Sequence, residues 1–557
     1  MKQKIYLLAV VFLCVASTSC KKLNDKFERL RTDPSGPTPD KANIDLYLNH
    51  TQLSFRNFWG NDRVNNPGSA TELGASLSRM EILLGGVTYS NVFVPETFDE
   101  LWDQAYRGVI NHSNTLIPLA EKAGLTTHMG IAKILKAYTL MTLVDYFGDV
   151  PNTESILGSE NTNPKTDKGE EIYKNALELL DAAMNDFKTP PATVPSNDLF
   201  YGGDVVKWTT LAKTLKLRAY LTTRLVNAAD SKAKIDALIT ENDLIDTDAE
   251  EFVFRYGTQL DNPVSRHPKF TRTYRVGFSA IEWIGTYFLW SLTEEKGLVD
   301  PRTRYYVYRQ RTSSVNWNGQ QLPCGIRSKP AHYSANTPFC ILPGGYWGRD
   351  HGNNDPIPQD NEKRTIYGVY YAGGKFDNDD NKSATPDDGA KGAGIHPIWM
   401  ASFTEFLKAE AAHTLSTSGN PKTLLESGIR KSIARVIAFP AQVGVTVPAN
   451  RVPTSAQINN YVTRVLNLYD AASADGKLNI IMKEWYMALW GNGYDAYNNY
   501  RRTGKPDDLQ PMISSTPGPF IRTFWYPAVT ANLNKGVTQK TDLTQRVFWD
   551  KNTDPLK

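Results

Sequence analysis

Apolar residues recur every three to four positions over long stretches of the chain, which is the spacing of one face of an α-helix. One such stripe runs from Leu101 to Ala120, and a second runs from Ile131 to Met141. Only a short turn that contains Gly124 separates the two stripes. The pattern therefore predicts two antiparallel helices that form a helical hairpin.

A second hairpin is predicted after the first. Its first helix carries an apolar stripe over residues 172–187, and Asp167 and Glu170 have the spacing of a capping box at its start. Its second helix carries a stripe over residues 208–219. Further helices fit residues 398–415, 421–438, 456–469 and 478–491. Such pairs resemble tetratricopeptide hairpins, although no strict 34-residue period is present. We expect a mainly α fold built from irregular helix pairs.

The middle of the chain has a different composition. From about residue 250 to residue 396 it is rich in Gly, Pro, Asn and aromatic residues, and it shows few helical stripes. Long irregular segments that are held by a helical scaffold commonly carry functional residues. We therefore expect a loop-rich, ligand-facing section over residues 250–396.

The first 19 residues have the pattern of a secretory signal. Lys2 and Lys4 precede twelve apolar residues, whereas about 20 are needed to span a membrane. Small residues follow at 17–19, and Cys20 stands where the mature chain would begin. A cysteine at this place predicts a lipoprotein, because acylation of its thiol and amine supplies the two or more chains that stable anchoring needs. The alternative is an ordinary signal peptide followed by an incidental cysteine.

The segment after Cys20 is charged and then rich in Pro, Gly, Asp and Thr. We expect residues 20–40 to form a flexible tether to a single folded domain over residues 41–557. Removal of residues 1–19 takes away two lysines and no acid, so the formal net charge falls from +3 to +1. A near-neutral chain has no strong attraction for nucleic acid. The sequence therefore predicts contact with the membrane through the lipid anchor only.

Motifs of common enzyme classes are absent from the sequence: there is no HExxH, GxSxG, Walker A or CxxC motif. We therefore predict a protein that is not an enzyme and that requires no cofactor. A glycosidase needs only two carboxylates about 5 to 10 Å apart, so a surface glycoside hydrolase stays as a less favoured alternative. Cys324 and Cys340 remain after lipidation, and they either form a disulfide or stay as two buried thiols.

Several segments together resemble the SusD/RagB family of outer-membrane nutrient-binding lipoproteins. They are the lipidated start, LWDQAYRGVINHSN, AKILKAYTLMTLVDYFGDVPNTESI, PIWMASFTEFLKAEAA, NIIMKEWYMALWGNGYDAYNNYRRTGKPDDL, FIRTFWYP and TQRVFWD. GRDHGNNDP, YAGGKFD and RRTGKP are most similar to the branch called starch-binding-associated. The resemblance implies a SusD-like helical fold with tetratricopeptide-like hairpins on the outer face of the outer membrane. It also implies a SusC-like TonB-dependent transporter as partner, to which the protein hands glycan oligosaccharides or, in some members, peptides.

Sugar binding requires exposed aromatic rings, because sugars present flat apolar faces rimmed by hydroxyl groups. The ligand candidates are the aromatic residues in or beside the irregular middle, together with one in a polar stretch near the start: Trp59, Trp283, Trp290, Trp317, Tyr346 and Trp347. Each of them can instead be a buried core residue. His351 is expected to organise its loop by hydrogen bonding rather than to act as a base, and Arg501 and Arg502 are expected to be solvated in a structural turn.

An acidic loop at residues 377–388 is a candidate calcium site. Asp377, Asp379, Asn381 and Asp388 occupy positions one, three, five and twelve of a calcium-loop spacing. Position six is a lysine where an EF-hand requires Gly, which excludes an EF-hand. A looser structural calcium site and a solvated acidic loop are the remaining alternatives.

Overall fold

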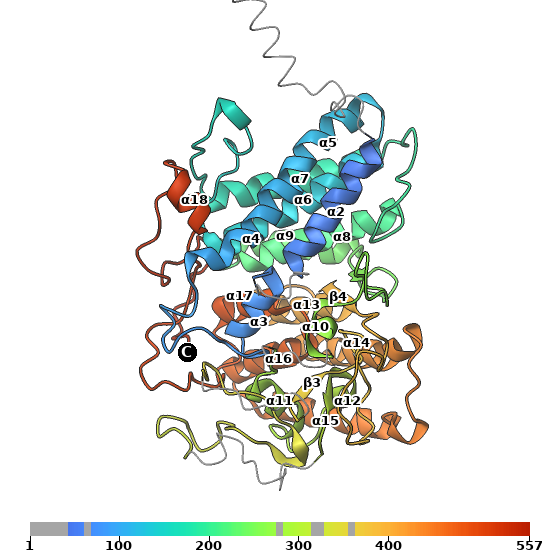
Figure 1. The fold of residues 1–557 in the computed structure, drawn as a ribbon, viewed down its shortest axis with the longest axis vertical. Helices are drawn as coiled ribbons and strands as arrows, with labels where there is room; N and C mark the ends of the chain where they lie inside the picture. The colour runs from blue at the N-terminus through green and yellow to red at the C-terminus, as the bar shows by residue number, and fades with distance from the viewer. Residues whose placement is uncertain (1–42, 61–67, 275–281, 313–327, 355–362) are drawn as a thin grey trace, which may run out of the picture.

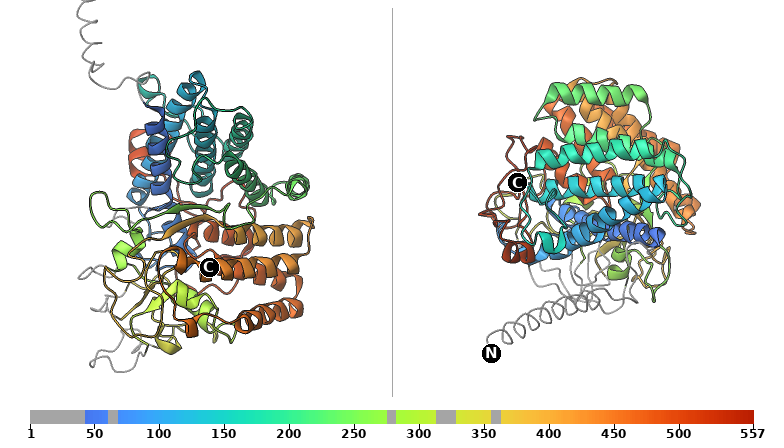
Figure 2. Two further views of the ribbon diagram at one scale, coloured as in Figure 1. Left: turned by 90° about the vertical axis from the view of Figure 1, so that its right-hand side faces the viewer. Right: turned by 90° about the horizontal axis from the view of Figure 1, so that it is seen from above.

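The computed structural model describes residues 43–60, 68–274, 282–312, 328–354 and 363–557, and these form two layers of helices (Figure 1). The upper layer holds α2 (Ile44–Trp59), α4 (Asp99–Asp103), α5 (Asn111–Lys122), α6 (Thr126–Phe147), α7 (Gly169–Asp186), α8 (Val205–Thr222) and α9 (Ala228–Glu241). The lower layer holds α3 (Ala70–Leu77), α10 (Pro268–Thr273), α11 (Thr286–Thr293), α12 (Thr303–Tyr306), α13 (Ala401–Leu415), α14 (Pro421–Gln442), α15 (Ser455–Ala471), α16 (Ala474–Ala488) and α17 (Gly493–Thr503). The helices of the two layers run in different directions (Figure 2). The mainly α fold that the sequence predicts is confirmed.

Both predicted hairpins are confirmed. α4 continues through a π-helical segment, Gln104–Ile110, into α5, and α6 returns beside them. α7 packs along α6, and α8 packs against α7. α6 is buried on nearly every side, which explains why its sequence is apolar almost all round. No helix in the described part of the chain, α6 included, is long and apolar enough to cross a membrane.

The predicted capping box at the start of α7 is wrong. Lys168 occupies the N-cap position and makes no side-chain capping bond. The Asp167 carboxylate accepts hydrogen bonds from the backbone N–H groups of Asn152 and Thr153 instead, at 2.8 and 2.9 Å. Asp149 accepts the N–H of Gly169 at 2.9 Å. The loop between α6 and α7 folds back against the start of α7, so a residue distant in sequence satisfies the helix N-terminus.

The four further predicted helices are confirmed as α13 to α16. α3 and α17 also pack closely, through two glycines. A Cβ atom on Gly74 would lie 2.2 Å from the carbonyl oxygen of Gly493, so a larger residue would force the helices apart. Towards the C-terminus, α18 (Ala528–Leu533) lies beside the upper layer in Figure 1.

The middle section is irregular, as expected, but paired strands hold it at two places within the described residues. β1 (Phe252–Arg255) pairs antiparallel with β4 (Ile395–Trp399). β2 (Val307–Arg309) pairs antiparallel with β3 (Thr365–Tyr367). β1 and β4 are the two ends of the section, and their pairing returns the chain to α13, which begins at Ala401. The pairing of β1 with β4 therefore brings the two ends of the irregular section together.

A buried carboxylate joins distant parts of the fold. Asp145 on α6 accepts hydrogen bonds from the Tyr173 hydroxyl at 2.5 Å, the Asn498 amide at 3.1 Å and the Trp549 indole at 2.8 Å. Tyr494 and Arg218 donate to the same carboxylate, and its exposed fraction is 0%. Asp145 thus connects α6 with α7, α8, α17 and the C-terminal segment.

Arg501 and Arg502 are buried, so the prediction that they are solvated is wrong. Arg501 donates to the backbone carbonyls of Asp145 and Arg522, both at 2.6 Å. Arg502 forms a bidentate ion pair with the buried Glu410 of α13. Their role is structural, as expected, but it lies in the interior.

A buried histidine makes stability depend on pH. Burial lowers the pKa of His396 on β4 from 6.5 to about 4. The unfolded chain takes up this proton first, so the contribution of His396 is full above pH 6.5 and is lost as the pH falls towards about 4. We expect the melting temperature of His396→Gln to fall less between about pH 7 and about pH 4.5 than that of the parent protein. An equal fall in both proteins would contradict this role.

Candidate functional site

A cavity of about 240 Å³ lies between α3, the segment that follows α3, and α10. Its polar lining consists of Glu72, Ser76, Glu81, Lys269 and Glu282, and Leu83 and Leu84 lie among its apolar lining. We call it the glutamate cavity. Ser76 and Leu84 are partly exposed, so the cavity is reached from solvent on their side. Ligand pockets commonly have about 300 to 1,000 Å³, so this cavity suits one terminal unit of a chain-like ligand.

Local helix geometry positions the charged groups of the glutamate cavity. Ser69 is the N-cap of α3 and accepts the backbone N–H of Glu72, which fixes Glu72 in the first turn. His267 caps α10 in the same way, accepting the N–H of Lys269 at 3.1 Å, and Pro268 occupies the first helical position. The two helix starts therefore place a carboxylate and an ammonium group beside each other.

Lys269 is the centre of a buried ion cluster. Its Nζ atom lies 2.7 Å from Glu81 and 2.8 Å from Glu282. Glu72 lies 3.2 Å from the same nitrogen and also pairs with Arg272. All five side chains are less than 10% exposed. Because buried charges are stable only when they are paired, the cluster holds the segment 81–84 and Glu282 against α3 and α10.

The cluster contains three carboxylates and two cations, so it has one negative charge in excess when all are ionised. Burial opposes ionisation of Glu72, but Arg272 and Lys269 outweigh it and lower the pKa of Glu72 to about 2. Burial raises the pKa of Glu81, and the neighbouring carboxylates add to this effect against the attraction of Lys269. The surroundings therefore disfavour an anionic ligand and accept an uncharged one.

One carboxylate oxygen of the ion cluster is shielded from solvent. Among the described residues, Glu72 Oε2 is buried and has no hydrogen-bond partner. Buried carboxylate oxygens are nearly always hydrogen-bonded, and Glu72 also lines a cavity of about 10 Å³ beside His267, which has room for about one water molecule.

Two of the predicted ligand residues support the cavity wall. Trp283 and Trp347 meet edge to face, with ring centroids 5.2 Å apart, and both are less than 5% exposed. They pack with Ile82, which also lines the cavity. Their rings are covered and do not form the exposed platform that we expected. Their contribution to the site is to fix the position of Ile82.

The other predicted aromatic residues lie away from the cavity. Trp59 is fully buried among Phe55, Tyr138 and Tyr494, so the prediction that its ring is an exposed platform is wrong. Trp290 on α11 is partly buried against the main core. The remaining two are Tyr346, which lines a second hollow, and Trp317, which lies outside the described residues.

The cysteine and histidine predictions have different outcomes. Cys340 is disulfide-bonded. Its proposed partner Cys324 lies outside the described residues, as does Cys20, so the pairing and the lipidation stay predictions. His351 is buried, its Nε2 lies 3.0 Å from the Tyr89 hydroxyl, and its backbone N–H donates to Gln510. It organises its loop, as expected.

The four predicted calcium ligands do not converge on one point. Asp377 pairs with Arg309 at 2.6 Å, and Asp379 pairs with three arginines. Asn381 accepts the N–H of Thr312, and Asp388 accepts the N–H of Thr385. Among the described residues, no group of three or more His, Cys, Asp or Glu side chains is placed to hold a metal ion. The arginines supply positive charge to these carboxylates, so the loop is neither the looser calcium site nor the solvated acidic loop that the sequence left as alternatives.

Sequence reasoning did not identify the charged residues of the glutamate cavity. Glu72, Glu81, Lys269 and Glu282 come from three separate stretches, and nothing in their local sequence indicates that they meet. One signal was present: Ser69 stands three residues before Glu72, which is the spacing of a capping box. It would have placed a helix start at this carboxylate, although not its partners.

Comparison with known proteins agrees with this fold. The SusD-like family model described as "Starch-binding associating with outer membrane" matches residues 77–527. Solved structures with a similar fold include a chitin-binding protein, with 20% sequence identity and a TM-score of 0.67 over 92% of this chain and 100% of that chain. A SusD/RagB family protein from Bacteroides thetaiotaomicron has 17% identity and a TM-score of 0.64, also over 92% and 100%. A chitin-binding SusD homologue from Flavobacterium johnsoniae has 19% identity and a TM-score of 0.61 over 91% and 99%. No curated protein sequence matches the chain.

The family match spans most of the chain, and it includes Glu81, Lys269 and Glu282 of the glutamate cavity and the whole irregular middle, whereas Glu72 and Ser76 on α3 precede it. The solved structures share the fold along nearly the full length of the described chain. The chain therefore belongs to the SusD-like family of starch-binding proteins that associate with the outer membrane.

Proposed function

We propose that the protein is a cell-surface lipoprotein that captures glycan oligosaccharides and delivers them to a SusC-like TonB-dependent transporter. The observation that carries the proposal is the family match over residues 77–527, whose description is starch-binding. Two proteins of similar fold are named as chitin-binding. Starch and chitin fragments are both uncharged chains of sugar rings, so the shared chemistry is a neutral oligosaccharide.

The glutamate cavity supports a neutral sugar as its occupant. The partly exposed Ser76 hydroxyl donates to the Leu73 carbonyl at 2.9 Å and can still accept a hydrogen bond at the lining. Leu83 and Leu84 offer apolar surface to the faces of a sugar ring. The excess negative charge of the cluster opposes an acidic sugar at this place. We infer that the cavity receives the end of a neutral chain.

Ser76 gives a direct test of this site. Ser76→Tyr fills the cavity from the partly exposed face of α3, so we expect it to weaken binding of maltohexaose or chitohexaose at least about tenfold in calorimetry. Ser76→Ala, the matched control, leaves the volume open and keeps the affinity within about threefold. Melting temperatures check that both variants fold. Unchanged affinity of the folded Ser76→Tyr variant would show that the oligosaccharide does not bind in this cavity.

Peptide binding and hydrolysis are the alternatives. The same titration with short peptides separates a peptide binder from a glycan binder. A hydrolase is favoured by one observation: Glu72 and Glu81, whose pKa values move in opposite directions, line one cavity. Against it, Lys269 contacts both carboxylates and would have to release them before either could act on a sugar. Release of shorter oligosaccharides by the purified protein would establish hydrolysis and overturn a binding-only role.

The anchor and the partner belong to the same proposal. A binding protein without a transport path needs a neighbouring channel, and a lipid on Cys20 would keep it at the membrane. We expect a large outer-membrane barrel protein to co-purify with the tagged protein in mild detergent, through an interface of more than about 2,000 Å². Cys20→Ala should lose acylation and keep the fold, because residue 20 precedes the helical scaffold. Absence of any barrel protein in several detergents would favour a free-standing surface binder.

A further inference from the structure

A second cleft, of about 590 Å³, lies in the lower layer and shares no lining residue with the glutamate cavity. Three parts of the chain form it: residues 298–309 around α12, Tyr346, and residues 450–461 at the start of α15. The labels of α12 and α15 mark the region in Figure 1. Its volume lies within the usual range for small-molecule sites, about 300 to 1,000 Å³. We call it the arginine cleft.

Three arginines of this cleft converge on one carboxylate. Asp379 Oδ2 lies 3.0 Å from Arg304 and 2.8 Å from Arg451, and its other oxygen pairs with Arg309. Arg309 also pairs with the buried Asp377 at 2.6 Å. Three guanidinium groups therefore face two carboxylates, which leaves one positive charge in excess. The sign is opposite to that of the glutamate cavity.

The positive charge is accessible. The Arg451 side chain is 37% exposed and that of Arg304 is 29% exposed. Among the described residues, Arg451 forms a single ion pair, through Nη2. A guanidinium carries five N–H donors, so Arg451 retains donors for a ligand. Carboxylates bind such donors in pairs, which gives strength and a fixed orientation.

The remaining lining suits the other parts of a sugar. The side chains of Asn450, Gln457 and Asn460 are exposed, and amides donate to and accept from sugar hydroxyls. Val299 and Val452 are exposed apolar residues beside them. The cleft thus combines positive charge, amides and apolar patches within one hollow.

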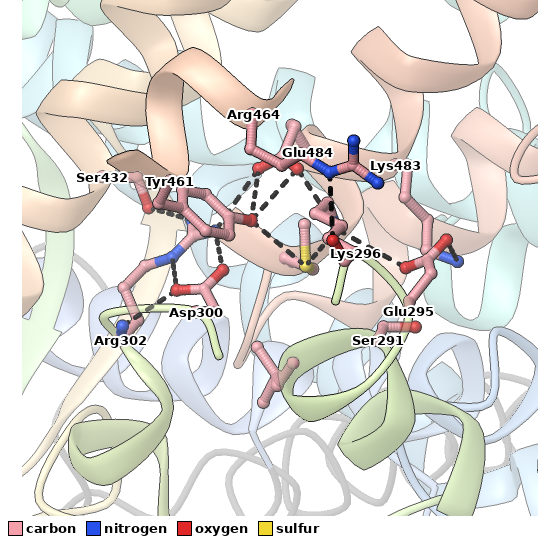
Figure 3. A network of polar contacts seen from close by, with 12 residues as sticks. Ser291, Glu295, Lys296, Asp300, Arg302, Ser432, Tyr461, Arg464, Lys483 and Glu484 are labelled. Atoms are coloured by element: carbon pink, nitrogen blue, oxygen red, sulfur yellow. Dashed lines mark hydrogen bonds and ion pairs between the residues drawn. The ribbon is translucent and has the colours of Figure 1, made fainter. Parts of the chain in front are cut away.

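A buried polar network, shown in Figure 3, adjoins the cleft. Asp300 and Tyr461 belong both to the cleft lining and to this network. Asp300 pairs with the fully buried Arg302 at 2.6 Å, and the Tyr461 hydroxyl bonds to Glu484 at 3.1 Å. Lys296 closes the network by pairing with Glu484 at 3.3 Å. Fully buried ion pairs allow little movement, so the cleft is formed before any ligand arrives.

We propose that the arginine cleft is a second ligand site, and that it takes a short acidic saccharide whose carboxylate pairs with Arg451 and Arg304. The inference goes beyond capture of a neutral glycan, because it uses a different surface and the opposite charge. It does not depend on whether the glutamate cavity binds sugar. The protein would then hold two chemically distinct sugar units at two places.

Calorimetry with digalacturonate tests the proposal, and its dimethyl ester serves as the uncharged probe. We expect digalacturonate to bind, the ester to bind at least about tenfold more weakly, and added salt to weaken binding of the acid. Arg451→Gln should reduce the affinity for digalacturonate at least about tenfold. Arg451→Lys, the matched control that keeps the charge, should retain part of the affinity. Both variants should bind maltohexaose or chitohexaose as the parent protein does.

Ser76→Tyr provides the control that shows which of the two sites binds digalacturonate. If the proposal holds, this variant of the glutamate cavity binds digalacturonate with unchanged affinity. The proposal is overturned if digalacturonate gives no heat with the parent protein, or if folded Arg451→Gln binds it as well as the parent protein does. It is also overturned if Ser76→Tyr no longer binds digalacturonate and Arg451→Gln still does, because digalacturonate then occupies the glutamate cavity.

Discussion

Replacement of Asp145 by alanine is expected to lower the free energy of unfolding by about 3 to 5 kcal/mol, because it takes an ion-pair partner from a buried arginine and the acceptor from several buried hydrogen-bond donors. Arg218 is 4% exposed and would lose one of its two carboxylate partners. The hydroxyls of Tyr173 and Tyr494 and the indole of Trp549 would lose their acceptor as well. These donors come from segments far apart in the sequence, so no local rearrangement can satisfy them all.

Urea unfolding followed by tryptophan fluorescence measures this loss. The matched control is Asp181→Ala, since Asp181 is 57% exposed and, among the described residues, pairs only with Lys216. Exposed pairs contribute about 0 to 1 kcal/mol, so the control should stay close to the parent protein. Equal, small losses in both variants would show that Asp145 does not join the layers as its contacts indicate.

Lys269→Met is expected to be the most damaging change at the glutamate cavity. It removes one of two cations from a cluster of three buried carboxylates and leaves two negative charges in excess. Breaking a buried pair on one side costs about 3 to 5 kcal/mol. The loss of Lys269 should also raise the pKa of Glu81 further, because burial and the neighbouring carboxylates already raise it.

The pH dependence identifies the cause of this damage. A carboxyl group whose pKa is higher in the folded than in the unfolded state stabilises the fold at low pH and loses that contribution as the pH rises through the folded value. Because the pKa of Glu81 is raised further in Lys269→Met, this variant should gain more stability from Glu81 than the parent protein does when the pH is lowered. The double variant Lys269→Met/Glu81→Gln should recover stability at neutral pH, because one unpaired charge is gone. Failure of both recoveries would mean that lost packing, not charge, explains the damage.

The scaffold could be predicted from the sequence because its signal is local. The stripes over residues 172–187 and 208–219 are properties of single helices, and they gave α7 and α8 with correct pairing. The prediction of a cap at Asp167 was wrong because Asp149, in the loop before α7, accepts the N–H of Gly169. Helix existence follows from periodicity, whereas a helix end depends on what packs against it.

The site could not be predicted to the same extent because its signals are long-range. Trp59 lies in a polar stretch and Trp283 in the irregular middle, and a sequence gives no measure of whether such a ring is covered. Asp377 and Asp379 have calcium-like spacing, but arginines from other segments neutralise them. The segments that bring together Glu81 and Lys269 are 188 residues apart, and no periodicity extends over such a distance.

The most direct test of glycan capture is a crystal structure of the protein soaked with maltohexaose or chitohexaose. The account predicts a sugar unit in the glutamate cavity, with a hydroxyl group within hydrogen-bond distance of the Ser76 hydroxyl on the partly exposed side. The apolar face of the sugar should lie against Leu83 or Leu84. Sugar bound only elsewhere on the surface, or an empty cavity at concentrations where calorimetry detects binding, would contradict it.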